Sequence, residues 1–254
     1  TNTGQCIPLN AVASGFIHTV KKYQLDPSKT MLWLNQSDIS CNIKMYPLHI
    51  KRILEKEGSG FENAHIYLGE LSLFDISVNA ARNAYFGYMF GGLIKSIACN
   101  IRPYEVNQNE TNKAEQTAIQ ILEQAFSAGL DKEKALREAL SPFRKIETRQ
   151  ARKSEVGIFG DLYIRDNRII NQDLISFIES YGGEAVITPY YKYIKIIASS
   201  YFRKWFAEGK YMNLISNRLI YSAMQTLEKK YYNHYYRGKI GYNINNHTKY
   251  IDEF

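Results

Sequence analysis

Four short apolar runs separated by helical patterns constrain the fold of this 254-residue chain more than any other feature. The runs lie at 29–35, 64–70, 155–164 and 184–189, and their length and apolar content are typical of buried strands. A helical pattern follows each run, and this alternation predicts βαβ units. We therefore expect an α/β fold of two lobes, in which helices flank mostly parallel sheets.

The middle of the chain carries the strongest helical patterns. Apolar residues fall on one stripe of the segment 110–128, and Asp131 is in position to cap a second helix at 131–143. The longest apolar stretch, NAYFGYMFGGLI, has 12 residues between Arg82 and Lys95. A helix that spans a bilayer needs roughly 20 residues. We therefore interpret this stretch as a buried helix and expect no membrane association.

The segment 144–154 marks the expected division between the lobes, because it is highly charged and lacks apolar periodicity. We expect an N-terminal α/β lobe at 1–150 and a C-terminal α/β lobe at 151–254. The second lobe is expected to be cut short at Phe254, where the sequence stops inside a helical pattern.

Composition narrows the functional classes. Three cysteines in a chain of this length argue against a disulfide scaffold and favour the cytoplasm. The net charge of +7 is compatible with a nucleic-acid partner, but it also follows from a general richness in Lys, Ile, Asn and Tyr. The sequence has no dinucleotide-binding, P-loop, zinc-protease, paired-cysteine or serine-hydrolase motif. Nothing in it supports a self-contained hydrolase, kinase or dehydrogenase.

Cys6 and Cys41, both in the expected N-terminal lobe, form the first candidate site. Cys6 precedes a helix expected to start near residue 9, and Cys41 follows the run at 29–35. Helix amino ends favour the thiolate that binds metal, and open α/β sheets bind ligands beyond the carboxyl ends of their strands. The two thiols either share an iron–sulfur cluster or are ordinary buried cysteines. Shared ligation requires sulfur atoms within about 7 Å of each other.

Two segments with arginines are candidate contacts for an anionic ligand or a partner. In IRPYEV, Arg102 either pairs with Glu105 or holds an anion, unless the segment is only a rigid connector between helices. In GDLYIRDNRIINQD, Arg165 and Arg168 precede a helix that Asn171 is expected to cap. The free amides at such a helix end favour anions, and the alternative is a solvated loop.

The segment KKYYNHYYRGK at 229–239 interleaves basic and aromatic residues. Such a pattern can stack on single-stranded nucleic acid. More often it belongs to a helix whose tyrosines pack against the protein and whose cations lie in water. We therefore do not expect nucleic acid as the partner.

Four stretches, taken in order, resemble one family: GQCIPLNAVASGFI, DPSKTMLWLNQSDISCNIKMY, IRPYEVNQNET and EVGIFGDLYIRDNRIINQDLISFIESYGGEAV. They cover roughly residues 3 to 190. They are similar to the D-component-like proteins of the 2-hydroxyacyl-CoA dehydratase group, which occur beside or fused to the CoA-substrate-specific enzyme activases.

The resemblance implies a Rossmann-like fold and a 4Fe-4S cluster, with Cys6 and Cys41 at the matching ligand positions. It also implies a lyase system with an activator ATPase of the Hsp70/actin/sugar-kinase type, fused or separate. In that system one electron passes through the cluster to a 2-hydroxyacyl-CoA thioester, and water is eliminated.

The chain departs from the family at the second cysteine. Of the family's Cys-Arg-Phe-Gly-Gln-Tyr run only Cys41 and Tyr46 are retained, and a further cysteine of the family has no match before Phe254. The ligand set on this chain is therefore incomplete. The alternative function is a non-catalytic interaction module that keeps the fold without the cluster, and a nucleic-acid-binding protein is the third.

Overall fold

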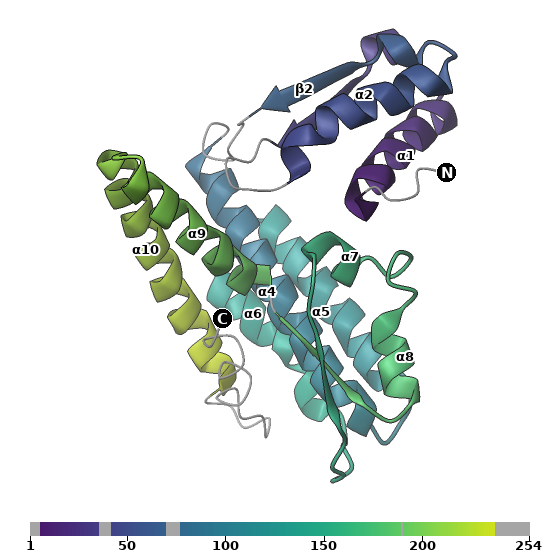
Figure 1. Cartoon of the computed structure of the whole chain (residues 1–254). Helices are drawn as coiled ribbons and strands as arrows, with labels where there is room; N and C mark the ends of the chain where they lie inside the picture. The colour runs from purple at the N-terminus through teal and green to yellow at the C-terminus, as the bar shows by residue number, and fades with distance from the viewer. Residues whose placement is uncertain (1–5, 36–41, 70–76, 189, 237–254) are drawn as a thin grey trace. The chain divides into compact units, whose positions relative to one another are not determined.

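The computed structural model divides the chain into two compact units, and the ribbon is drawn in Figure 1. Residues 6–35, 42–69, 77–188 and 190–236 are described. Unit 1 consists of Thr1–Ala84 and Gly160–Asp173, and unit 2 consists of Tyr85–Phe159 and Leu174–Phe254. Each unit is a region in which contacts between residues are dense. The domain boundary expected near residue 150 stays a prediction.

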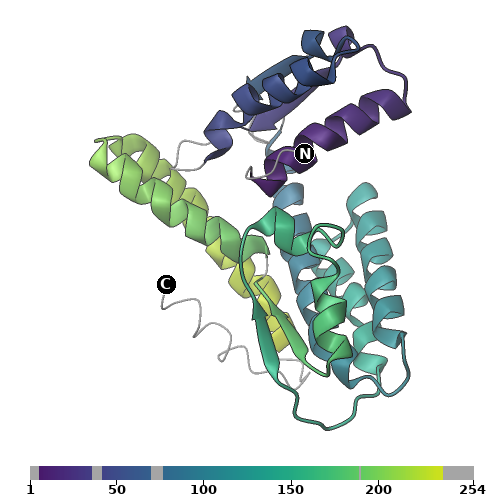
Figure 2. The ribbon, with the colours of Figure 1, turned by 45° about the vertical axis from the view of Figure 1, so that its right-hand side comes forward.

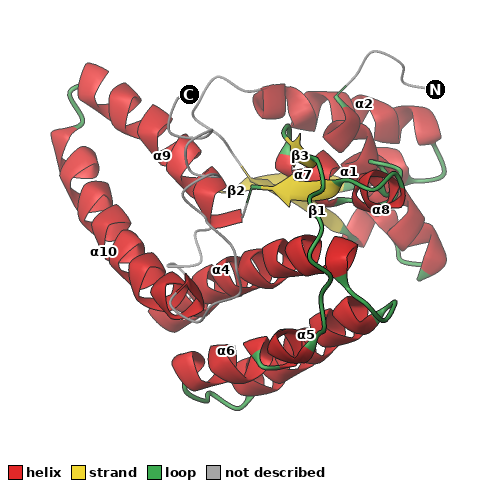
Figure 3. Ribbon diagram, turned by 90° about the horizontal axis from the view of Figure 1, so that it is seen from below, coloured by secondary structure: helices red, strands yellow, loops and turns green. Residues whose placement is uncertain are grey.

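Unit 1 is a small parallel sheet covered by helices. It contains α1 (Ile7–Lys22), β1 (Met31–Asn35), α2 (Tyr46–Glu57), β2 (His65–Gly69) and the short α7 (Leu162–Asp166). Three single turns of 3-10 helix lie at Pro27–Lys29, Asn42–Met45 and Phe61–Asn63. The strands pair in parallel from Met31 opposite His65 to Asn35 opposite Gly69, and Figure 3 shows them in yellow.

The core of unit 1 forms where the apolar stripes of α1 and α2 meet the sheet. Leu9 and Ala13 of α1, Ile50 and Leu54 of α2, and Leu34 of β1 are all buried in one cluster. The stripe of α2 follows the spacing of three to four residues that places side chains on one helix face. The described part of the unit is thus a single βαβ motif, β1-α2-β2, to which α1 and the short α7 are added.

Unit 2 is mainly helical. Its helices are most of α4 (Val78–Ile101), α5 (Glu110–Ser127), α6 (Lys132–Leu140), α8 (Leu174–Ser180), α9 (Tyr190–Ala207) and α10 (Tyr211–Tyr236). Its strands are β3 (Glu155–Ile158) and β4 (Glu184–Ile187), and 3-10 turns lie at Arg102–Tyr104 and Pro142–Lys145. The strands pair in parallel, with Glu155 opposite Glu184.

The apolar stretch between Arg82 and Lys95 builds the core of unit 2. Met89 and Phe90 of α4 are fully buried, and they pack with buried residues of α5, α6 and α10. The ring of Tyr231 in α10 meets the ring of Phe90 edge-on, with centroids 5.3 Å apart. The expectation of a buried helix is therefore confirmed. Within the described residues, no helix is both long and apolar enough to cross a membrane.

Helices α9 and α10 lie side by side as an antiparallel pair, which Figure 2 shows in light green and yellow. The ring of Phe202 in α9 meets the ring of Tyr221 in α10 edge-on, with centroids 5.6 Å apart. Gly209, with φ of +69°, lies in the turn between them. Only a residue without a Cβ atom adopts this left-handed conformation at little cost.

The expectation of two Rossmann-like lobes with mostly parallel sheets flanked by helices is wrong. The described chain is mostly helical and has two sheets of two short parallel strands each. The four apolar runs do contain the four strands, and both pairs are parallel. Each strand pairs with only one other, however, and the main core of unit 2 forms between helices instead of on a sheet.

The run at 155–164 also ends earlier than expected. Strand β3 stops at Ile158, and Gly160 has φ of +125°. The carboxylate of Asp161 then accepts hydrogen bonds from the backbone amides of Tyr163 and Ile164, which caps α7. A capped turn therefore replaces the second half of the expected strand.

Candidate functional site

The thiol of Cys6 lies at the amino end of α1, and its surroundings are well defined. Cys6 is the residue before the first helical turn, which begins Ile7-Pro8. Its Sγ atom lies 3.0 Å from the phenol oxygen of Tyr46, the first residue of α2. Cys6 is half-buried and Tyr46 is buried. The structure thus joins a candidate ligand to a residue 40 positions away that the resemblance also retains.

Cys41, the expected partner of Cys6, lies outside the described residues. The distance between the two sulfur atoms therefore stays a prediction. Among the described residues, no group of three or more histidine, cysteine, aspartate or glutamate side chains is arranged to hold a metal ion. Within that part of the chain, Cys6 provides a single thiol beside a phenol.

Cys99 differs from Cys6 in its burial. It is 2% exposed and packs against Ile158 and Ala185 in a small core of unit 2. Burial raises the pKa of the Cys99 thiol to about 12, although the positive charge of Arg102 acts in the opposite direction. A thiol in this state is neither a nucleophile nor a ligand at neutral pH. Cys99 is therefore a core residue.

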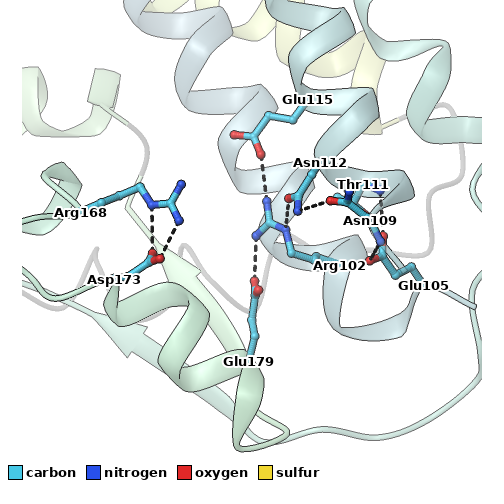
Figure 4. A network of polar contacts seen from close by, with 9 residues as sticks. All are labelled: Arg102, Glu105, Asn109, Thr111, Asn112, Glu115, Arg168, Asp173 and Glu179. Carbon is cyan, nitrogen blue, oxygen red and sulfur yellow. Dashed lines mark hydrogen bonds and ion pairs between the residues drawn. The ribbon is translucent and has the colours of Figure 1, made fainter. Parts of the chain in front are cut away.

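Arg102 lies at the centre of a polar network in unit 2, drawn in Figure 4. Its guanidinium donates to Glu115 of α5 at 2.8 Å and to Glu179 of α8 at 2.9 Å. Its Nε atom donates to Asn112 at 2.8 Å. Side chains of this chain thus occupy all three nitrogen atoms of the guanidinium. Burial raises the pKa of Glu179, although Arg102 acts in the opposite direction.

Glu105 does not pair with Arg102 but caps the next helix. Its carboxylate accepts hydrogen bonds from the backbone amides of Asn109 and Thr111, at 2.7 and 2.8 Å. A carboxylate at the amino end of α5 also interacts favourably with the helix dipole. Arg102 and Glu105 therefore hold α4, α5 and α8 together, and a role for either in binding a ligand or partner stays a prediction.

A buried carboxylate lies at the start of β4. Glu184 is 6% exposed, and it accepts a hydrogen bond of 2.6 Å from the phenol of Tyr104. Burial raises the pKa of Glu184, although this hydrogen bond acts against the shift. Partial burial and the same hydrogen bond raise the pKa of Tyr104 to about 12. No sequence motif indicated this pair, because its members are 80 residues apart.

The loop with Arg165, Arg168 and Asn171 lies in unit 1 and is held by its own contacts. Arg165 is buried and pairs with Asp166 at 3.1 Å. Arg168 makes a bidentate pair with Asp173, and the amide of Asn171 donates to the carbonyl oxygen of Arg165. Asn171 does not cap a helix, because α8 begins only at Leu174. Contact with an anionic ligand or partner stays a prediction for all three residues.

Residues 229–236 of the basic and aromatic segment at 229–239 belong to helix α10. Tyr231 is buried against the ring of Phe86, and Lys230 pairs with Glu133 at 3.2 Å. These contacts agree with the expectation of tyrosines packed against the protein. Residues 237–239 lie outside the described part of the chain.

No protein-family model matches this chain, and no curated protein or solved structure is significantly similar to it. The described residues form a mainly helical protein with two small parallel sheets, and a half-buried thiol lies at the amino end of one helix.

Proposed function

We propose that the chain is a component of a thiol-based redox system, in which the Cys6 thiolate is one ligand of an iron–sulfur centre. The observation that supports the proposal is the 3.0 Å contact between the Cys6 sulfur and the Tyr46 phenol. The sequence resemblance supplies the chemistry, which is one-electron transfer from an activator ATPase to a 2-hydroxyacyl-CoA thioester.

The chemistry of the two side chains fits this role in part. When Cys6 is ionised, the Tyr46 hydroxyl is the donor and the sulfur is the acceptor. Hydrogen bonds to ligand sulfur atoms set the reduction potential of such centres. The amino end of α1 adds a favourable field, because a helix dipole stabilises negative charge there.

This chain does not supply a full set of cysteine ligands for the cluster. A 4Fe-4S cluster takes four cysteine ligands. Cys6 is the only suitable thiol among the described residues, and Cys41 is a second by prediction. The remaining ligands must therefore come from outside these 254 residues, from a further segment of the protein, a partner chain or small thiols.

Iron binding tests the proposal directly. The protein is reconstituted anaerobically with ferrous iron, sulfide and excess dithiothreitol, which can complete the ligand set, and bound iron and sulfide are then measured. We expect binding by the wild type and by the control variant Cys99→Ala, and its loss in Cys6→Ser and Cys41→Ser. Equal iron in the wild type and Cys6→Ser, or none in the wild type, would contradict the proposal.

The non-catalytic interaction module and the nucleic-acid-binding protein stay predictions. The first differs from the proposal in binding no iron. The second requires a steep fall of affinity with salt, because nucleic-acid binding releases counterions.

A further inference from the structure

Helix α10 is apolar on two opposite sides, and the described residues of unit 2 cover only one of them. On the inner side Leu214 is buried, Tyr221 packs on Phe202 of α9, and Tyr231 packs on Phe90 of α4. A helix that is apolar all round is normally buried all round. The other side therefore needs an explanation.

The outer face of α10 consists of Met212, Ile215, Leu219, Ser222 and Thr226. Met212 is 80% exposed, Ile215 55% and Leu219 69%, and the two polar residues are exposed as well. The five positions alternate steps of three and four residues, which places them in one line along the helix. This spacing is that of a seam against which a second helix packs.

The residues in the second half of this face favour a helix, and not a lipid surface, as the binding partner. Ser222 and Thr226 are small, so a neighbouring backbone can approach closely. The Thr226 hydroxyl donates to the carbonyl oxygen of Ser222 in the same helix and needs no further partner. A helix that lies in a membrane interface instead carries bulky apolar residues along its whole length.

Charge decides which kind of helix fits. Glu228 is the only carboxylate in the sequence of α10, and it is buried, where it accepts a hydrogen bond from Tyr85 at 2.9 Å. Arg218, Lys229 and Lys230 are exposed. The accessible charges of the helix are therefore all positive. A second copy of α10 would bring like charges together, whereas an acidic helix would complement them.

We propose that the outer face of α10 is a docking site for one amphipathic helix with acidic residues beside its apolar seam. Met212, Ile215 and Leu219 supply the apolar contact, and Arg218 and Lys229 select an acidic partner. The site is independent of Cys6, so either proposal can fail without the other.

Two synthetic peptides test the site on the full chain. Both form amphipathic helices with the same leucine seam, and they carry either glutamate or lysine at the flanking positions. We expect saturable binding of the acidic peptide by fluorescence anisotropy, at least about tenfold tighter than binding of the basic peptide. Equal affinities, or no saturation of the acidic peptide below about 1 mM, would overturn the proposal.

Variants locate the binding on α10. Leu219→Asp replaces an exposed residue, so the fold is retained, and it should weaken acidic-peptide binding by about tenfold or more. The matched control Ile119→Asp, at an exposed position of α5, should change affinity less than about twofold. Equal loss in both variants overturns the site. Binding to phosphatidylserine vesicles or self-association that Leu219→Asp abolishes, without peptide binding, would assign the face to a membrane or a second copy.

Discussion

The guanidinium of Arg102 lies 2.9 Å from the carboxylate of Glu179, which is 77 residues further along the chain. This ion pair ties the turn after α4 to helix α8 and, through it, to the small sheet of unit 2. The side chains of Arg102 and Glu179 are only 19% and 12% exposed. Removal of one partner would therefore leave a poorly hydrated charge.

Replacement of Arg102 tests how much this network stabilises unit 2. We expect Arg102→Met to lower the free energy of unfolding by about 3 kcal/mol, because Glu115 and Glu179 lose their counter-charge. Arg137→Met is the control, since Arg137 makes an exposed pair with Glu133, and exposed pairs contribute little to stability. Urea denaturation followed by circular dichroism measures both. Equal losses in the two variants would show that the network is not a special source of stability.

The stability of unit 2 should depend on pH through Glu184. Its pKa is higher in the folded than in the unfolded chain, so its contribution is present at low pH and is lost as the pH rises through the folded value. Glu184→Gln retains an acceptor for Tyr104 and removes the charge. We expect the variant to be more stable than the wild type at neutral pH and equal to it near pH 4. A variant that is less stable at neutral pH would contradict this sign.

Thiol reactivity should separate the two described cysteines. Cys99 is buried and its thiol pKa is raised to about 12, so alkylation there requires local opening of the core. Cys6 is half-buried, so we expect it to react without unfolding. Mass spectrometry after a short iodoacetamide pulse should find label on Cys6 and none on Cys99 until urea is added. Equal labelling rates in the native protein would show that the Cys99 core is open.

Local features of the fold could be predicted from the sequence because local chemistry determines them. Asp131 caps α6 through a 2.7 Å hydrogen bond to the Lys134 amide, and Gly182 has the left-handed φ expected of a helix end. The four apolar runs also mark the strands. The number of strands that join one sheet is a long-range property, and the runs carry no information about it. The expectation of Rossmann-like lobes was wrong for that reason.

The polar contacts were less predictable than the elements. The sequence offers Glu105 as a neighbour of Arg102, but the guanidinium pairs with Glu115 of α5 and Glu179 of α8, which are distant in the sequence. Cys6 was identified as a candidate from its position before a helix. Its contact with Tyr46 depends on the packing of α1 against α2, which no local pattern specifies.

The central claim, that Cys6 ligates iron, is tested most directly by iron K-edge absorption of the reconstituted protein. For the wild type and Cys99→Ala we predict a first shell of sulfur at about 2.3 Å. In Cys6→Ser, any iron that remains bound should show fewer sulfur neighbours and an added oxygen. Identical spectra for the wild type and Cys6→Ser, at equal iron content, would contradict the claim.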